Sequence, residues 1–405
     1  MFFLISWRNL WRNRRRTIIA AASVFFAVLL AVVMRSGQRG SYSYMIDSSA
    51  KLFTGYMQVQ GTGYWDNRSL DRSIILDESM QKKLREIDHV TATAPRLETF
   101  SLVAHESDTK VAQIIGIDPA MEDSMTGLKK WLVRGNYLLP DTHGVMISQG
   151  MAERLKIAIN DSLVIYGQGY HGQIAAAKLP VTGILKLPLS ELNNSTVYLG
   201  LDNARDVFSA YNRITSLAFM IDNINNLQAA KGNIRKLIGE KFEIMTWDEM
   251  LPDLVQSIAL DNAGGIIMLV ILYIVIAFGV FGTVMMMTGE RKKEFGILIS
   301  VGMKKSRLIL VTVLETVFIS FLGVAAGISG SLPVIYYLHF NPVHMTGDAA
   351  RAFDTIGVEP IMNFSTDPRI LFYQSFVVLL IALATAVYPV LFISRIRPAE
   401  AVHSG

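Results

Sequence analysis

The chain has 405 residues, of which 51% are hydrophobic and 18% are charged. This balance is too apolar for a wholly soluble protein and too polar for one that lies entirely in lipid. The absence of cysteine excludes disulfides and cysteine-ligated metal sites. The net charge of +4 is modest, and the basic residues cluster beside apolar runs.

The chain begins with a basic, amphipathic segment, residues 1–16, followed by an uncharged run over residues 17–34. The run is just long enough to cross about 30 Å of hydrocarbon. A cleaved signal peptide would share the basic start and the apolar core, but Met34-Arg35-Ser36-Gly37 offers no clear small-x-small cleavage site. We therefore predict an uncleaved signal anchor as the first span.

Two segments join this span and the next to the region between them. Residues 35–58 and 246–262 carry apolar stripes at helical spacing, which predicts two stalk helices whose stripes face each other or a second copy. Two interfacial helices lying flat on the membrane are the alternative, but their flanks are not strongly basic. The stripes include Met45, Leu52, Phe53, Leu254, Val255 and Ile258.

Residues 59–245 have the patterns of a soluble α+β domain. We expect one subdomain from residues 59–119 and 212–245, and a second, inserted one from residues 120–211, with elements on either side pairing across the insertion. Strands are predicted at residues 57–60, 109–117, 160–166, 179–185 and 216–221, and helices at 77–88, 150–157, 202–210 and 226–239.

Three further apolar runs can span a membrane: residues 263–288, 307–338 and 370–393. Helices of this length satisfy their own backbone groups in lipid. Arginine and lysine cluster before the first span, between the second and third, and after the fourth. The positive-inside rule therefore places both termini, including the tail at 394–405, in the cytoplasm, and the loop at 339–369 outside.

The predicted fold class is thus a membrane α-helical protein with four transmembrane helices. A large α+β periplasmic domain is inserted between helices 1 and 2 on a helical stalk.

The polar segment 289–306 lies between the second and third spans and is predicted to be a short, charged cytoplasmic helix. Glu315 is the one carboxylate inside a predicted span. It could relay motion between the charged segment and the membrane helices, or it could make a structural hydrogen bond to a serine or threonine, such as Thr312 or Ser320 on its own helix.

Small residues in the third span favour close helix packing, because Gly323, Gly327 and Gly330 leave one face nearly flat. We expect Gly279 and Gly282 in the second span to be their counterpart.

Motifs for catalysis are missing from the sequence. It contains no Gly-x-x-x-x-Gly-Lys-Ser/Thr phosphate-binding loop and no His-Glu-x-x-His motif. Its histidines are scattered without metal-ligand spacing. We predict no catalytic residue, no metal site and no cofactor in this chain.

The segment from Glu290 to Met303, followed by Glu315 and the Gly323/Gly327 pair, resembles the signature of FtsX-like permeases. These are the membrane subunits of MacB-type (type VII) ABC transporters. The segments 5–17, 144–156, 160–164 and 388–402 are also similar to this family, so the resemblance covers essentially the whole chain.

The resemblance implies mechanotransmission. A cytoplasmic ABC ATPase dimer on separate chains would bind ATP and Mg²⁺, and a second permease copy or a paralogue would complete the complex. The polar segment would act as a coupling helix seated on the ATPase. The implied coupling residues are Glu290, Arg291, Lys292, Lys293, Glu294, Phe295, Gly296 and Gly302.

Length and local sequence are most similar to the lipoprotein-releasing (LolC/LolE-like) branch of the bacterial inner membrane. The implied substrate is a lipoprotein or another acylated or amphipathic molecule, handled in an apolar stalk cavity that would include Met268. A hairpin containing Gly167, Gln168, Tyr170 and His171 would recruit a periplasmic carrier; as the alternative, it is a flexible tip. Membrane lipids are expected partners and nucleic acid is not.

Three other functions fit parts of this pattern. They are a MacB-like permease for efflux or peptide export, a non-transporting FtsX-like regulator of envelope enzymes, and a sensory receptor. The regulator usually has a much smaller outer domain, and a receptor would need a cytoplasmic signalling domain for which no segment is long enough.

Overall fold

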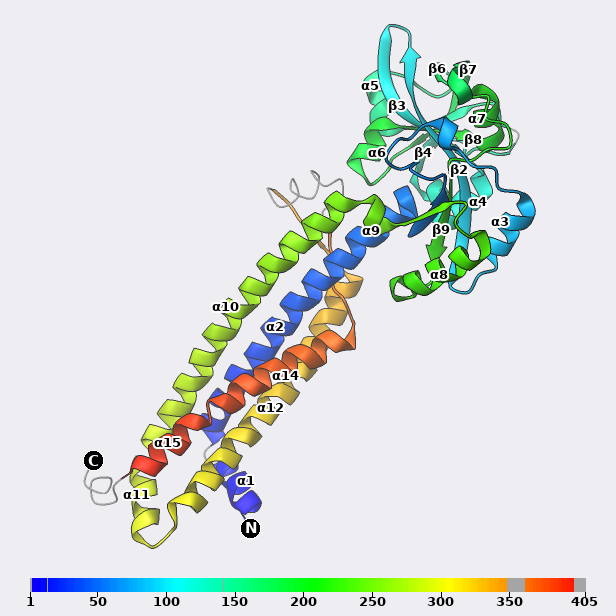
Figure 1. Cartoon of the computed structure of the whole chain (residues 1–405). Coiled ribbons are helices and arrows are strands. Elements are labelled where there is room, and N and C mark those ends of the chain that lie inside the picture. Colours follow the sequence, from blue (N-terminus) through cyan, green and yellow to red (C-terminus); the bar gives the residue numbers. More distant parts are fainter. Residues whose placement is uncertain (1, 13, 141, 348–360, 397–405) are drawn as a thin grey trace. The chain divides into compact units, whose positions relative to one another are not determined.

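The computed structural model describes residues 2–12, 14–140, 142–347 and 361–396, without the side chains of Phe2, Lys51 and Leu52 (Figure 1). The chain divides into two compact units. We call Met1–Tyr44, Ser257–His344 and Ile361–Gly405 the membrane unit, and the unit around Met45–Gln256 the sheet unit. Within the described residues, four helical segments are long and apolar enough to cross a membrane.

The membrane-spanning segments are α2 (Arg14–Ser49), α10 (Pro252–Glu290), α12 (Lys305–Phe340) and the consecutive helices α14 (Pro368–Ala384) and α15 (Val387–Arg395). Two shorter helices, α1 (Phe2–Arg12) and α11 (Lys292–Ser300), precede α2 and α12. A small ladder of β11 (Val343–His344) and β12 (Ile361–Met362) follows α12.

The range 370–393 predicts a single helix for the fourth apolar segment, but the structure has two. It breaks at Thr385 and Ala386, between α14 and α15. Pro389 lacks the N–H that would bond to the Thr385 carbonyl four residues earlier, and the Tyr388 N–H bonds to that carbonyl instead at 3.1 Å. The proline therefore explains the interruption.

The glycines of α12 pack on α2. A Cβ added to Gly323 would lie 2.6 Å from Val24 Cβ and 2.8 Å from the Ala21 carbonyl oxygen, and one added to Gly327 would lie 2.6 Å from Val28 Cβ. At Gly330 the neighbour is the Phe25 ring, at 2.7 Å. The predicted counterpart in α10 is wrong, because an added Cβ at Gly279 or Gly282 meets nothing within 4 Å.

The stalk segments are direct continuations of α2 and α10 rather than separate helices. α2 runs to Ser49 and passes into a π-helical turn, η1 (Ala50–Thr54). Gly55 then takes φ +71°, and β1 begins at Met57, so the stalk ends earlier than residue 58. On the other side α9 (Trp247–Met250) precedes α10, whose first residue is Pro252, a position where the missing N–H costs nothing.

The sheet unit is built on one ten-stranded sheet in the order β10-β1-β9-β2-β3-β8-β5-β7-β4, with β6 pairing β2 and β7. The pairing of β1 with β9 and β10 joins segments on either side of the expected insertion. The strands are β1 (Met57–Gln60), β2 (Val90–His105), β3 (Asp108–Ile117), β4 (Leu132–Gly135), β5 (Val145–Ser148), β6 (Ser162–Gln168), β7 (Ile174–Leu185), β8 (Thr196–Gly200), β9 (Ser216–Ile221) and β10 (Glu243–Thr246).

Part of this sheet closes on itself. The circuit β2-β3-β8-β5-β7-β6 returns to β2, because β6 pairs with both β7 and β2. Its interior is an apolar core that includes Val103, Ile114, Ile147, Ile165 and Val197. A second core, with Met57, Phe219 and Ile234, lies against the open part of the sheet.

The predicted boundary between two subdomains at residues 119/120 is therefore wrong. β2 and β3 lie before that boundary, but their distal halves pair into the closed circuit formed with β5–β8. β2 spans both parts: its first half pairs with β9 and its second half with β6. The two cores lie on one sheet, and no single position in the chain separates the residues of one core from those of the other.

The helices of the sheet unit are α3 (Glu78–Arg85), α4 (Pro119–Thr126), α5 (Gln149–Leu155), α6 (Ser190–Ser195), α7 (Leu201–Val207) and α8 (Leu227–Ile238). Of these, α3, α5, α7 and α8 lie close to the predicted ranges. The predicted ranges did not include the strands β2, β4, β5, β8 and β10 or the helices α4 and α6. In β2 the apolar residues are interrupted by buried polar ones, such as Arg96 and Glu98.

Candidate functional site

The charged segment meets the membrane helices at Glu315. Arg291, in the turn between α10 and α11, donates a hydrogen bond through Nη1 to Glu315 Oε2 on α12. Both side chains are buried, and the Arg291 Nε also lies 3.3 Å from Glu294 Oε2. The partner of Glu315 is thus an arginine from the polar segment. Thr312 and Ser320 instead donate to backbone carbonyls of their own helix.

The second oxygen of Glu315 is held by the N-terminal helix. Asn9 Nδ2 on α1 donates to Glu315 Oε1 at 2.7 Å, and Ser6 Oγ donates to the Val311 carbonyl at 3.1 Å. A further ion pair joins Arg16 at the start of α2 to Glu290 at the end of α10, with 2.7 Å between Nε and Oε2. Three of the four spans and α1 therefore meet in one polar cluster, which we call the coupling node: Asn9, Arg16, Glu290, Arg291, Glu294 and Glu315.

A small cavity lies beside the node. Its volume is about 30 Å³, and its lining includes Arg291, Glu315, Thr316 and Ser320 together with apolar residues of α2 and α10. That volume accommodates one or two water molecules. The node therefore combines a buried ion pair with space for movement, since a close-packed interface would leave no such void.

The structure separates the predicted coupling residues into two groups. Arg291, Phe295 and Gly296 are buried, whereas Lys292, Lys293 and Glu294 are exposed. Gly302 lies in the turn after α11 at φ +102°, a conformation that favours glycine. The segment is also not one helix over residues 289–306, because α10 ends at Glu290 and α12 begins at Lys305.

Phe295 anchors α11 in the membrane unit. It is fully buried in a small core with Leu308 of α12 and with Ile393 and Ile396 of the C-terminal region. Lys305 Nζ also donates to the Ser394 carbonyl at 2.9 Å. α11 is thus packed against two spans, so that a displacement of α11 would reach both of them.

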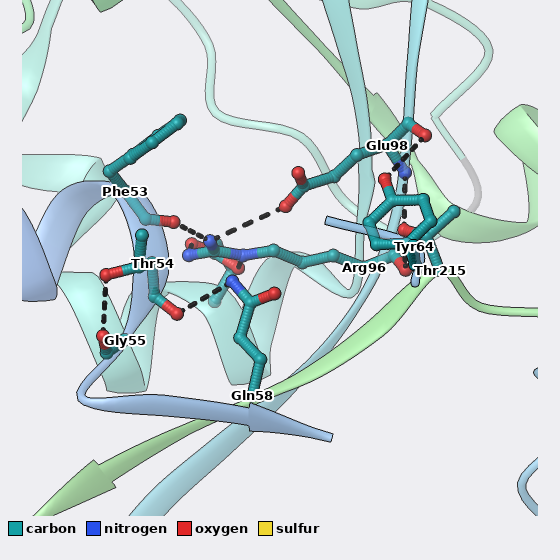
Figure 2. Close-up of polar contacts among 9 residues, drawn as sticks. Phe53, Thr54, Gly55, Gln58, Tyr64, Arg96, Glu98 and Thr215 are labelled. Carbon is teal, nitrogen blue, oxygen red and sulfur yellow. Dashed lines mark hydrogen bonds and ion pairs between the residues drawn. The ribbon is translucent and has the colours of Figure 1, made fainter. Parts of the chain in front are cut away.

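A second buried polar cluster lies in the sheet unit (Figure 2). Arg96 of β2 binds Glu122 of α4 through two nitrogens, with Nη2 to Oε1 at 2.6 Å and Nε to Oε2 at 3.0 Å. Its Nη1 donates to the carbonyl of Phe53 in η1 and lies 3.8 Å from Glu98 Oε1. Gln58 Nε2 donates to the next carbonyl, Thr54, at 2.8 Å. The end of the stalk helix is therefore held by side chains of the sheet.

The charges of this cluster are unequal, because one guanidinium faces two carboxylates. Burial raises the pKa of Glu98 above its ordinary value, although Arg96 and Arg68 act in the opposite direction. The pKa of Arg96 is also raised: burial alone would lower it, but the charges of Glu122 and Glu98 and the hydrogen bonds to Glu122 outweigh that effect. Apart from Phe53, which was predicted only as a stalk residue, this cluster was not predicted, and its one local signal is the Arg96-Leu97-Glu98 triplet in β2.

The predicted stalk residues lie in different surroundings. Met45 and Leu254 are buried, Val255 and Ile258 are half-buried, and Met268 on α10 is 56% exposed. The Phe53 ring packs on Trp65 at 6.3 Å between centroids. The Leu52 side chain lies outside the described residues.

The predicted carrier-docking hairpin is a turn that contacts three other segments, and is not the free tip of the alternative prediction. Gly167 and Gln168 end β6, and the Tyr170 N–H donates to the Phe208 carbonyl at 2.9 Å. The His171 N–H donates to Asp71 Oδ1 at 2.8 Å, and the Arg213 guanidinium lies 4.1 Å from the centre of the Tyr170 ring. The turn is therefore fixed on three sides.

No cluster of three or more histidine, aspartate or glutamate side chains suited to a metal ion occurs among the residues that the structure describes. The prediction of no metal or cofactor in this chain remains a prediction.

Comparison with known proteins identifies the family. Residues 17–237 match the MacB-like periplasmic core domain, and residues 266–398 match the C-terminal region of FtsX-like permeases. The chain is 20% identical over 347 residues to the lipoprotein-releasing system transmembrane protein LolC of Neisseria meningitidis serogroup B, covering 81% of each chain.

Other relatives include transporters of a second kind. The macrolide export ATP-binding/permease protein MacB of N. meningitidis serogroup A is 20% identical over 349 residues, which cover 82% of this chain and 53% of that protein. The crystal structure of the periplasmic region of MacB from Actinobacillus actinomycetemcomitans is 17% identical, with a TM-score of 0.37, covering 51% of this chain and 95% of that one. The chain belongs to the FtsX-like permeases with a MacB-like periplasmic core domain, and it is an ABC transporter permease of the LolC/LolE or MacB type.

Proposed function

We propose that this chain is the membrane subunit of an ATP-driven mechanotransmission transporter that extracts lipoproteins from the inner membrane and passes them to a periplasmic carrier. The observation that carries the proposal is the buried Arg291–Glu315 pair, which connects the polar segment after α10 directly to the interior of a membrane-spanning helix. A permease needs such a connection if force applied to one end of its helices is to reach the rest.

The exposed face of α11 would contact the ATPase. Lys293 and Ile297 are exposed and four residues apart, and Val301, directly after the end of α11, is 82% exposed. Residues four apart lie on one helix face. The buried members, Arg291 and Phe295, would pass the movement on to α12 and α15 and would not touch the ATPase. ATP and Mg²⁺ would be bound by that partner, and this chain would carry no catalytic residue.

The apolar face of α10 would contact a second permease copy or a paralogue, and the substrate. Of the 18 most apolar consecutive residues of α10, only 17% are buried, compared with 44% of the corresponding residues of α12. Ile267, Met268, Val275 and Phe278 are among its exposed side chains. An interface of this kind would present apolar surface to acyl chains, whose removal from lipid into water costs about 0.8 kcal/mol per CH₂ group.

A carrier would need exposed apolar surface in the sheet unit. The predicted turn at Gly167–His171 offers little of it, but Leu102 and Tyr166 are exposed neighbours on the adjoining strands β2 and β6. We place carrier docking on this outer wall of the closed circuit, next to the turn. The termini and α11 would be cytoplasmic and the sheet unit periplasmic, as the charge distribution predicts.

The test is reconstitution of the chain in vesicles with its ABC ATPase, its permease partner and a triacylated lipoprotein. We expect lipoprotein release that depends on ATP. Gly296→Pro would break α11, and Glu290→Lys would remove the partner of Arg16, so both should abolish transport-coupled ATPase activity while the permease stays inserted. Lys292→Gln, on an exposed position of α11, is the matched control for expression and insertion.

Normal release by both variants would refute the coupling role. A MacB-like export permease is the second candidate, supported by the match of residues 17–237 to the MacB-like core domain. It would be recognised by binding of an outer-membrane duct partner and by export without lipoprotein release.

A further inference from the structure

We propose that α1 binds anionic phospholipid headgroups at the membrane surface where α2 enters, and that this binding regulates the coupling node through Asn9. The regulatory part rests on the function proposed above. The lipid-binding part stands on the geometry of α1 alone.

The helix presents three distinct faces. At 3.6 residues per turn, Phe3, Leu4, Trp7 and Trp11 fall within about 100° of one another, and all four are exposed, with Leu4 at 63% and Trp11 at 56%. The face toward the bundle adjoins the aromatic face on the side of Phe3; on it Leu10 is 4% exposed and Ser6 and Asn9 bond to α12. Phe3 and Trp7 also pack edge-to-face on Phe318 of α12, which fixes the rotation of α1.

The third face carries positive charge at the border of the apolar one. Arg8 and Arg12 lie one turn apart between the aromatic face and the bundle face. Both are exposed, and neither has an ion-pair partner among the residues that the structure describes. The nearby Arg16 is different, because it is paired with Glu290. Free arginines beside exposed tryptophans are the arrangement that anionic lipid interfaces attract.

The position of α1 next to a spanning helix favours the membrane surface, rather than a soluble acidic protein, as the partner of its arginines. α1 ends at Arg12 and the spanning helix α2 begins at Arg14, so the two helices are separated by a single residue. The Thr17 hydroxyl donates to the Leu10 carbonyl at 2.9 Å and ties the end of α1 to the first turn of α2. The aromatic side chains of α1 are therefore held within reach of the bilayer surface.

The link to the node is short. Asn9 lies between Arg8 and Leu10 and donates to Glu315, whose other oxygen accepts from Arg291. A headgroup bound by Arg8 and Arg12 would hold α1 in the position in which Asn9 keeps Glu315 aligned with Arg291. Without the anionic lipid, α1 would be held less firmly, and Glu315 would lose the hydrogen bond from Asn9 that keeps it aligned with Arg291.

Lipid binding can be measured without any ATPase. The full chain is placed in phosphatidylcholine nanodiscs containing either brominated phosphatidylglycerol or the same fraction of brominated phosphatidylcholine, and tryptophan quenching is compared. Brominated phosphatidylglycerol should quench more strongly, and the difference should disappear in Trp7→Phe/Trp11→Phe, which leaves the tryptophans of the sheet unit. Each lost arginine should lower the local enrichment of the anionic lipid by about fivefold.

Arg8→Gln/Arg12→Gln should therefore show a much smaller preference for brominated phosphatidylglycerol, with Arg14 and Arg15 still present, and added salt should have a similar effect. Lys292→Gln/Lys293→Gln removes the same charge from the exposed face of α11 and should retain the preference. Equal quenching in the unmodified chain, or an unchanged preference in Arg8→Gln/Arg12→Gln, would overturn the lipid site. The lipid site would also be overturned if this variant kept its lipid preference but no longer co-purified with the ATPase, because the two arginines would then contact the ATPase.

Regulation is tested with the ATPase present. Phosphatidylglycerol should raise the coupled ATPase rate of the unmodified chain but not that of Arg8→Gln/Arg12→Gln. A lipid preference with no effect on the coupled rate would overturn the regulatory link. If no lipid mixture supports a coupled rate, the proposed transporter function fails, and the quenching result still decides the lipid site.

Discussion

Arg291 and Glu315 are 24 residues apart and form a buried ion pair between the turn after α10 and the interior of α12. Asn9 occupies the second oxygen of the same carboxylate. A charge pair taken out of water stabilises a fold only when its geometry is good and its remaining polar atoms are satisfied. Substitutions at this pair should therefore change the stability of the membrane unit and the coupled ATPase activity to different extents.

Replacement of Glu315 by leucine should destabilise the membrane unit by about 3–5 kcal/mol, because buried Arg291 would lose its buried partner and keep only the exposed Glu294 carboxylate. Arg291→Met/Glu315→Leu should recover most of this loss, since an apolar pair of similar volume avoids the uncompensated charge. Thermal unfolding in nanodiscs measures both effects. We expect coupled ATPase activity to stay low in the double variant, and full recovery of coupling would show that the pair is only structural.

Close packing of α12 on α2 predicts that Gly323→Ala is destabilising, because the new Cβ would lie 2.6 Å from Val24 Cβ. Overpacking of this kind costs about 1–3 kcal/mol. Gly279→Ala is the matched control on α10, where a Cβ meets nothing within 4 Å, and its melting temperature should not fall. Equal losses in the two variants would contradict the assignment of Gly323 to the α2 interface.

Arg96→Met should destabilise the sheet unit by about 3–5 kcal/mol, since Glu122 would lose its bidentate partner and the Phe53 carbonyl its donor. Urea unfolding followed by hydrogen exchange in β2 reports on this unit within the full chain. Arg134→Met, at an exposed position of β4, serves as the control and should change little. Unchanged exchange in Arg96→Met would mean that the stalk end is held by other contacts.

The raised pKa of Glu98 predicts a pH dependence of the sheet unit's stability. A group whose pKa is higher in the folded state binds its proton more tightly there, so its contribution is complete below its ordinary pKa. The contribution is lost as the pH rises through the folded-state pKa. Glu98→Gln should therefore lose less stability than the unmodified chain between acidic and neutral pH, measured by unfolding at each pH. An identical pH profile for both chains would refute the prediction.

Local sequence patterns were sufficient for the long helices and for several elements of the sheet unit. Continuous apolar runs predict spans because a helix in lipid satisfies its own backbone groups, and β9 follows its predicted range, residues 216–221. β2 was missed because its buried positions include Arg96 and Glu98. The Arg96 side chain is compensated by Glu122 and the stalk end, and Glu98 lies beside Arg96. Glu122 and the stalk end are distant in the chain and leave no periodic signal.

The sequence by itself determined that this protein has four apolar helical segments, a large α+β insertion and a polar segment before the third span, because hydropathy and periodicity are properties of neighbouring residues. Only the tertiary structure decided which groups meet. It joined Glu315 to Arg291 and Asn9, packed Gly323 on α2 rather than α10, and closed β2 and β6 into one circuit. Such contacts depend on which surfaces fit together in three dimensions, and residue spacing along the chain does not specify them.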